Sequence, residues 1–107
     1  GKVCNPPLAG ESDRRLRDYT MYFVYILFSL KDMKRYTGYT ENISMRLQEH
    51  NNGLVRSTRN RRPLILIYKE TYPQKKDAME RERFFKTGKG REFLNSVIKN
   101  NSPLPFL

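Results

Sequence analysis

Apolar and polar positions along the chain predict three strands. From Tyr22 to Phe28 every side chain is apolar or aromatic, a pattern typical of a strand covered on both faces, so we expect this strand at the centre of a sheet. Lys31 to Lys34 predict a polar turn, and strand-forming residues resume from Arg35 to Thr40, which together predict an antiparallel hairpin. A third strand is predicted from Leu64 to Glu70.

A helix is predicted between the second and third strands. From Glu41 to Asn51, the apolar residues Ile43 and Leu47 fall on one stripe, as they do in a helix that packs one face on a sheet. Gly53 follows directly and is a typical C-terminal stop.

Two further helices are predicted after the third strand. Pro73 suits the first turn of a helix that reaches about Thr87, and Gly88 and Gly90 end that helix before a last one from about Arg91 to Lys99. The predicted fold is therefore α+β, a three-stranded antiparallel sheet flanked by helices, in the order ββαβαα.

The chain is long enough for one domain with one modest core. Residues 1–20 contain Pro6, Pro7 and a run of charges with few apolar side chains, so we expect a leader or an added extension outside the fold. The domain is predicted over residues 21–99, and residues 100–107 are predicted to form a short C-terminal tail.

The net charge of the chain indicates which class of partner it binds. The 107 residues include 21 Lys and Arg against 11 Asp and Glu, for a formal net charge of +10 and an isoelectric point near 10.0. Positive and negative charges nearly cancel in residues 1–20, so the excess lies in the predicted domain. Polyanions, nucleic acids above all, are the expected partners.

Cysteine and hydropathy indicate the compartment. Cys4 is the only cysteine, so neither an intrachain disulfide nor a cysteine-based zinc site is expected, and we expect a cytoplasmic protein. The longest apolar run, Phe23 to Phe28, is far shorter than the roughly 20 residues that cross a bilayer, so no membrane partner is expected.

A basic loop follows the first predicted helix. It has no acidic residue, so we expect it to follow the sugar-phosphate backbone with little base preference, the alternative being a solvated, flexible loop. Its arginines are Arg56, Arg59, Arg61 and Arg62.

A glutamate occupies an unexpected place on the helix after Pro73. With Ala78 at zero on a helical projection, Glu82 falls at about 40° and Phe85 at about −20°, so Glu82 lies within the apolar face. A carboxylate in a dry core would cost several kcal/mol. Either this face opens onto a wet cleft where Glu82 binds a metal ion, or Glu82 is buried and satisfied by an arginine such as Arg46 or by backbone donors.

Arg46 and His50 are one helical turn apart and border the buried stripe of their helix. An arginine beside a histidine at the rim of a core can grip a phosphate oxygen and pass a proton. The alternative is that both side chains only pack and cap.

Two short motifs carry a resemblance to a known family. Val24 to Ile26, followed by Tyr36 to Gly38, resemble the two strand motifs of the GIY-YIG nuclease superfamily, and the resemblance covers about residues 21 to 99. It is strongest to small, stand-alone bacterial members. Phe23 replaces the glycine of the first motif and Thr37 the branched apolar residue of the second, and neither change removes a reactive group. The positions that match the family's site are Tyr25, Tyr36, Gly38, Arg46, His50 and Glu82.

The resemblance implies a metal-dependent endonuclease that hydrolyses phosphodiester bonds. Glu82 would hold one Mg²⁺ or Mn²⁺, and Arg46 would clamp the phosphate. Tyr25 would be the general base, with Tyr36 as its rival, and nearby cations would have to lower its pKa from about 10. His50 would accept or orient the tyrosine proton.

The remaining expectations concern the end of the site and its substrate. The family often has an asparagine late in the domain, for which Asn95 is the candidate, and Gly38 would allow close backbone approach. Single-stranded or structured DNA is favoured over RNA as substrate. The alternatives are a catalytically silent nucleic-acid-binding module, or a nuclease domain that needs a protein partner for specificity.

Overall fold

The protein folds around a three-stranded antiparallel sheet. The computed structural model describes residues 20–101, so the predicted leader, except Thr20, and residues 102–107 of the predicted tail lie outside the described residues. The strands are β1 (Tyr22–Ser29), β2 (Arg35–Thr40) and β3 (Leu64–Tyr72), in the spatial order β2-β1-β3. The predicted α+β order ββαβαα and the central place of the first strand are both confirmed.

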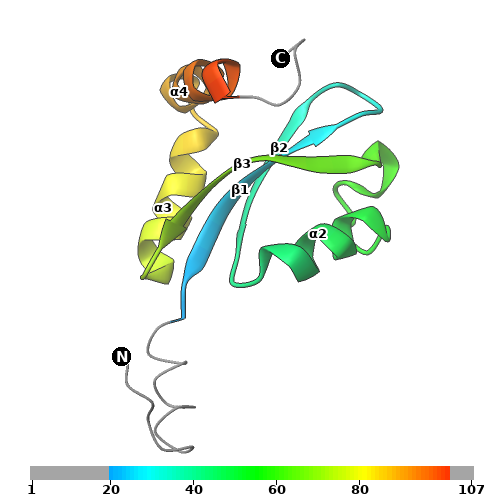
Figure 1. Cartoon of the computed structure of the whole chain (residues 1–107), viewed down its shortest axis with the longest axis horizontal. Coiled ribbons are helices and arrows are strands. Elements are labelled where there is room, and N and C mark those ends of the chain that lie inside the picture. The colour runs from blue at the N-terminus through cyan, green and yellow to red at the C-terminus, as the bar shows by residue number, and fades with distance from the viewer. Residues whose placement is uncertain (1–19, 102–107) are drawn as a thin grey trace, which may run out of the picture.

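Helices cover both faces of the sheet, as Figure 1 shows. Val24 and Ile26 of β1 point to the face covered by helices α3 and α4, whereas Tyr25 and Leu27 point to the face covered by helix α2. This division follows from the two-residue side-chain period of a strand, and it explains why every position from Tyr22 to Phe28 is apolar or aromatic. The buried residues on the α3 and α4 side are Val24, Ile26, Ala78, Phe85, Leu94 and Ile98.

Helix α2 (Ile43–Asn51) begins two residues after the predicted start. Asn42 is its N-cap, and its side chain accepts a hydrogen bond of 3.0 Å from the amide of Met45, which satisfies one of the free amides of the first turn. The predicted start at Glu41 did not allow for this cap.

The same helix ends at Asn51, and Gly53 follows it as the C-terminal stop, as predicted. Gly53 has a φ of 80°, a left-handed conformation that favours glycine. Its amide donates to the His50 carbonyl at 3.2 Å, and the amide of Leu54 donates to the Glu49 carbonyl at 2.9 Å, the hydrogen-bond pattern of a Schellman motif. This closure fixes the last turn, which carries His50.

Helices α3 (Lys75–Phe85) and α4 (Gly88–Asn101) meet at a corner, and both boundaries differ from the prediction. Pro73 precedes α3 instead of opening it, because pairing with β1 extends β3 to Tyr72. The glycines do not end α3 either, because they lie in the first turn of α4. A β-carbon at Gly90 would overlap the Phe84 carbonyl group, so Gly90 lets the start of α4 approach the end of α3.

The basic loop contains a single turn of 3₁₀ helix, η1 (Arg59–Arg61). No helix within residues 20–101 combines the length and the apolarity needed to cross a bilayer.

Candidate active site

A buried hydrogen-bonded chain connects the first strand to the basic loop. The Tyr25 hydroxyl lies 3.0 Å from Nε2 of His50, and Nδ1 of His50 lies 2.7 Å from Oγ1 of Thr58. His50 and Thr58 are fully buried and Tyr25 is 3% exposed. Three separate segments of the chain therefore meet in this series of contacts with the Tyr25 hydroxyl.

The contacts of His50 permit the tautomer that carries its proton on Nδ1. The Thr58 hydroxyl donates to the Val55 carbonyl at 3.5 Å, so its oxygen is available to accept from Nδ1–H of His50. Nε2 then has a free lone pair and accepts the Tyr25 hydroxyl proton. Burial, and next the positive charge of Arg46, lower the pKa of His50 to about 4, so the imidazole is neutral at neutral pH.

Gly38 makes room for the phenol. It pairs directly with Tyr25 across the two strands, and a β-carbon at position 38 would lie 2.5 Å from the Tyr25 hydroxyl oxygen. We expected this glycine to allow close backbone approach, and the group that approaches is the Tyr25 side chain. The ring centroid of Tyr36 lies 6.5 Å from that of Tyr25 and 5.1 Å from that of His50, so both tyrosines share this pocket.

The pKa of Tyr25 is raised above 10.0 in the protein alone. Burial is the largest cause, and the negative charges of Tyr36 and Glu82 add to it, while interaction with the Arg46 guanidinium acts in the opposite direction. The requirement stated above, a lowered pKa, is therefore not met by Arg46 alone.

Arg46 and Glu82 do not form the ion pair that was the alternative to a metal site. Arg46 pairs with Glu49 at 2.9 Å, and Glu82 pairs with Lys86 at 3.6 Å. The Glu82 side chain is 22% exposed and that of Lys86 is 59% exposed, so the carboxylate is partly buried and still accessible. Among the causes that shift the pKa of Tyr25, the charge of Glu82 is the smallest.

Glu70, on β3, is a glutamate whose carboxylate oxygens accept hydrogen bonds from several side chains. Glu70 accepts hydrogen bonds from Arg81 at 2.8 and 3.2 Å and from the hydroxyls of Tyr68 and Tyr72, each at 2.6 Å. Burial raises the pKa of Glu70, but these donors outweigh burial and lower it overall. Within residues 20–101, Glu82 pairs with Lys86 and has no comparable set of donors, and this contrast separates a structural carboxylate from a candidate ligand.

The donor set near Glu82 suits a hard cation bound by one carboxylate. Within residues 20–101 no three histidine, cysteine or acidic side chains come together as a metal-binding group. Mg²⁺ is commonly held by only one or two carboxylates, with waters and substrate phosphates completing the shell. A single, partly exposed carboxylate therefore fits the role predicted for Glu82.

The other predicted residues lie around this centre. Asn95, on α4, accepts a 2.8 Å hydrogen bond from Arg35. Arg61 is engaged by the fold, since its Nε lies 2.6 Å from Asp32 and its Nη2 donates to two backbone carbonyls of the β1–β2 turn. Arg56, Arg59 and Arg62 are exposed.

Sequence reasoning missed Thr58, Arg35 and Arg91. Thr58 follows His50 by eight residues in a loop with no regular period, so no spacing pattern marks it. Arg35 and Arg91 are brought together only by the tertiary structure, as described below.

Comparisons with known proteins identify the family of this chain. A model of the GIY-YIG catalytic domain matches residues 21–95. The chain belongs to the GIY-YIG family. Among its relatives, UPF0213 protein SH2523 of Staphylococcus haemolyticus is 39% identical over 77 residues, which cover 71% of this chain and 93% of that protein. UPF0213 protein CPE1444 of Clostridium perfringens is 43% identical over 67 residues, covering 62% and 71%.

A solved structure is also similar to this GIY-YIG domain. The solution NMR structure of UPF0213 protein BH0048 from Bacillus halodurans is 34% identical, with a TM-score of 0.48, and the match covers 78% of this chain and 88% of that one.

Proposed function

We propose that this GIY-YIG domain is a metal-dependent endonuclease that hydrolyses phosphodiester bonds in DNA, with single-stranded or structured DNA favoured. The observation that carries the proposal is the Tyr25–His50–Thr58 chain, because a buried neutral imidazole that accepts a phenol proton is a proton path. Arg46 and Glu82 border the same phenol.

In this proposal Tyr25 passes its proton to His50 while it accepts one from water, so no free phenolate forms before the attack. The pKa of Tyr25 lies above 10.0 and that of His50 at about 4. Because burial raises the pKa of Tyr25 and lowers that of His50, transfer from Tyr25 to His50 before substrate binds is disfavoured. During attack, the Tyr25 oxygen takes a proton from water while its own proton moves to Nε2 of His50. The Thr58 hydroxyl holds the opposite ring nitrogen throughout.

Two charged groups would handle the phosphate. Arg46 presents a partly exposed guanidinium that pairs with Glu49 on its own helix, and it can bind phosphate oxygens as negative charge builds up. Glu82 would hold a divalent cation, which when bound supplies positive charge to the phosphate and the attacking water. With this added positive charge, the pKa values of water and Tyr25 fall toward that of His50.

The proposal is tested by cleavage assays on labelled single- and double-stranded DNA and RNA, with Mg²⁺, Mn²⁺ or a chelator. We compare the wild type with Glu82→Ala, and with Glu80→Ala as matched control, since Glu80 is an exposed carboxylate on the same helix. Chelation and Glu82→Ala should both abolish cutting while binding survives, and Glu80→Ala should cut normally. Cutting that persists without Glu82 overturns the proposal, and binding without cutting under every condition favours a catalytically silent module.

A further inference from the structure

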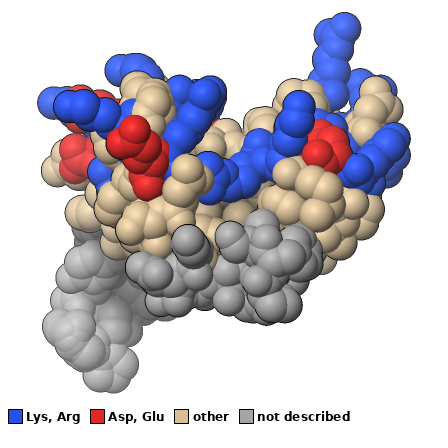
Figure 2. Space-filling model, turned by 90° about the horizontal axis from the view of Figure 1, so that it is seen from above, with Lys and Arg blue, Asp and Glu red and all other residues tan. Residues whose placement is uncertain are grey.

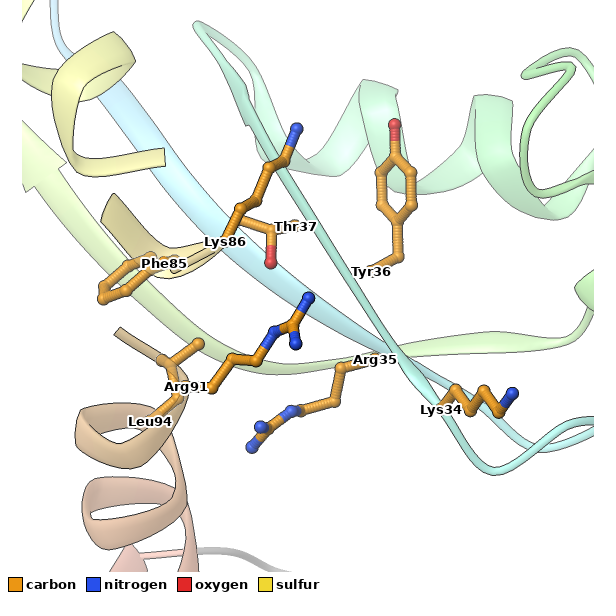
Figure 3. A pocket seen from close by; sticks show the side chains of 8 residues that line it. All are labelled: Lys34, Arg35, Tyr36, Thr37, Phe85, Lys86, Arg91 and Leu94. Atoms are coloured by element: carbon orange, nitrogen blue, oxygen red, sulfur yellow. The ribbon is translucent and has the colours of Figure 1, made fainter. Parts of the chain in front are cut away.

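A basic cleft lies between β2 and the corner of α3 and α4. It has a volume of about 470 Å³. In Figure 3, Arg91 extends from the start of α4 toward β2 and Arg35 extends from β2 toward α4, whereas Lys34 turns away from both. Its lining includes no acidic residue, and consists of Lys34, Arg35, Lys86 and Arg91 around Phe85 and Leu94, with Tyr36 and Thr37 at its edge.

The two arginines of the cleft face each other without a counter-ion. Neither Arg35 nor Arg91 forms an ion pair within residues 20–101. Burial lowers the pKa of Arg35, and the positive charge of Arg91 lowers it further. Asn95 holds the Arg35 guanidinium at 2.8 Å and brings no charge. Like charges that converge in a cleft attract anions, because the low-dielectric walls concentrate their field.

The cleft adjoins the candidate active site. Lys86 lines the cleft and also pairs with Glu82 at 3.6 Å, and Tyr36 lines the cleft while its ring contacts that of His50. A strand whose reacting phosphate lies near Glu82 and Arg46 therefore has its next phosphates within reach of this cleft. Figure 2 shows lysine and arginine side chains spread across this side of the molecule.

We propose that this cleft is a second phosphate site, which holds a backbone phosphate of the substrate strand beside the one that is cut. Arg35 and Arg91 grip its oxygens, and Lys86 lies between this phosphate and the reacting one. The inference rests on the proposed function, because the phosphate belongs to the strand being hydrolysed. Guanidinium forks match phosphate oxygens two at a time, and the apolar floor of Phe85 and Leu94 offers no groups that read base edges.

The cleft also explains how the strand binds although Arg61 of the basic loop is occupied. Arg61 is held by Asp32 and by backbone carbonyls of Lys34 and Arg35, and these contacts fasten the loop to the beginning of β2. Arg61 thereby supports the strand that presents Arg35. Substrate contact falls mainly to the cleft, and the exposed arginines of the loop add to it.

The test measures binding of a short fluorescent single-stranded DNA in a Glu82→Ala background, without metal, over a series of salt concentrations. The variant is Arg35→Gln/Arg91→Gln. The matched control is Lys75→Gln/Lys76→Gln, which removes the same charge from exposed positions at the other end of α3. Lys75 lies about 16 Å from Lys86 along the helix, beyond the Debye length of about 8 Å at physiological salt.

The arginine variant should bind roughly 10- to 100-fold more weakly, as expected for the loss of charge-assisted hydrogen bonds. Its plot of log affinity against log salt should be shallower by about 1, because fewer counterions are released. The control should change affinity by less than about threefold. Unchanged affinity and slope in the arginine variant, or an equal loss in the control, overturns the second phosphate site. Thermal unfolding confirms that each variant is folded. If the double variant is not folded, the single variant Arg91→Gln takes its place in the binding test.

A second readout locates the contact directly. In NMR titrations with the same oligonucleotide, the backbone amides of residues 34–37 and 86–91 should shift, and those of residues 75–77 should not. If these amides stay in place while binding occurs, the cleft is not the site. This outcome is independent of cleavage, so a failure of the proposed function appears only in the Glu82→Ala cleavage assay and a failure of the cleft only in the binding data.

Discussion

Replacing Gly38 by alanine should disrupt the phenol–imidazole pair at the centre of the account. The added β-carbon would lie 2.5 Å from the Tyr25 hydroxyl oxygen and 2.6 Å from Cζ, whereas ordinary non-bonded contacts begin at about 3.5 Å. The tip of Tyr25 must therefore retreat by about 1 Å, and the 3.0 Å hydrogen bond to His50 cannot survive unchanged. Because both partners are buried, no solvent replaces the lost contact.

The magnitude follows from two costs. Overpacking a core costs about 1–3 kcal/mol, and leaving a buried polar group without its partner costs about 1–3 kcal/mol. Gly38→Ala should therefore lower the free energy of unfolding by about 2–6 kcal/mol, a large part of the roughly 5–15 kcal/mol available to a small domain.

Urea unfolding of Gly38→Ala against Gly88→Ala provides the assay. A β-carbon at Gly88 would meet nothing within 4 Å, and it lies in the first turn of α4, so Gly88→Ala should be neutral or stabilise by up to about 1 kcal/mol. If Gly38→Ala unfolds within about 0.5 kcal/mol of the wild type, the packing argument for Gly38 is wrong.

Two further predictions concern the imidazole. Thr58→Val removes the acceptor of Nδ1–H, and should lower the free energy of unfolding by about 1–3 kcal/mol and slow cleavage, while Thr58→Ser should retain both properties; equal behaviour of the two variants would exclude a hydrogen-bonding role. The pKa of His50 falls from 6.5 to about 4 on folding, so the unfolded chain binds the proton more tightly. Stability should be complete above about pH 6.5 and fall by about 3 kcal/mol as pH decreases to about 4. Because His50 is the only histidine, His50→Gln should remove most of this slope in pH-dependent unfolding, and a slope that persists in full would contradict the assignment.

The parts of the fold that the sequence predicted are those set by local period. An unbroken apolar run gave the central strand, and helical stripes gave the elements that flank it. The helix boundaries were less accurate, because the pairing of Tyr72 with Tyr22 continues β3 past the residues that would otherwise begin α3. Strand pairing over this distance along the chain leaves no local signal at Pro73.

Some residues of the candidate site could be identified from the sequence, whereas others became evident only in the structure. The position of Glu82 on an apolar helix face was evident from the sequence, but its actual partner, Lys86, became clear only in the structure. The buried Thr58 and the facing pair Arg35 and Arg91 depend on contacts across the fold, and no spacing in the sequence marks them. The raised pKa of Tyr25 likewise depends on burial, which a motif does not specify.

The central claim is that the Tyr25 hydroxyl carries a proton during phosphodiester hydrolysis, and a single-turnover cleavage assay of Tyr25→Phe with Mg²⁺ tests it most directly. The substitution removes one oxygen and keeps the ring, so substrate affinity should stay within about threefold. The cleavage rate should fall at least about 100-fold, as expected for loss of a general base, and Tyr36→Phe should lose less. Cleavage by Tyr25→Phe at the wild-type rate would contradict the account.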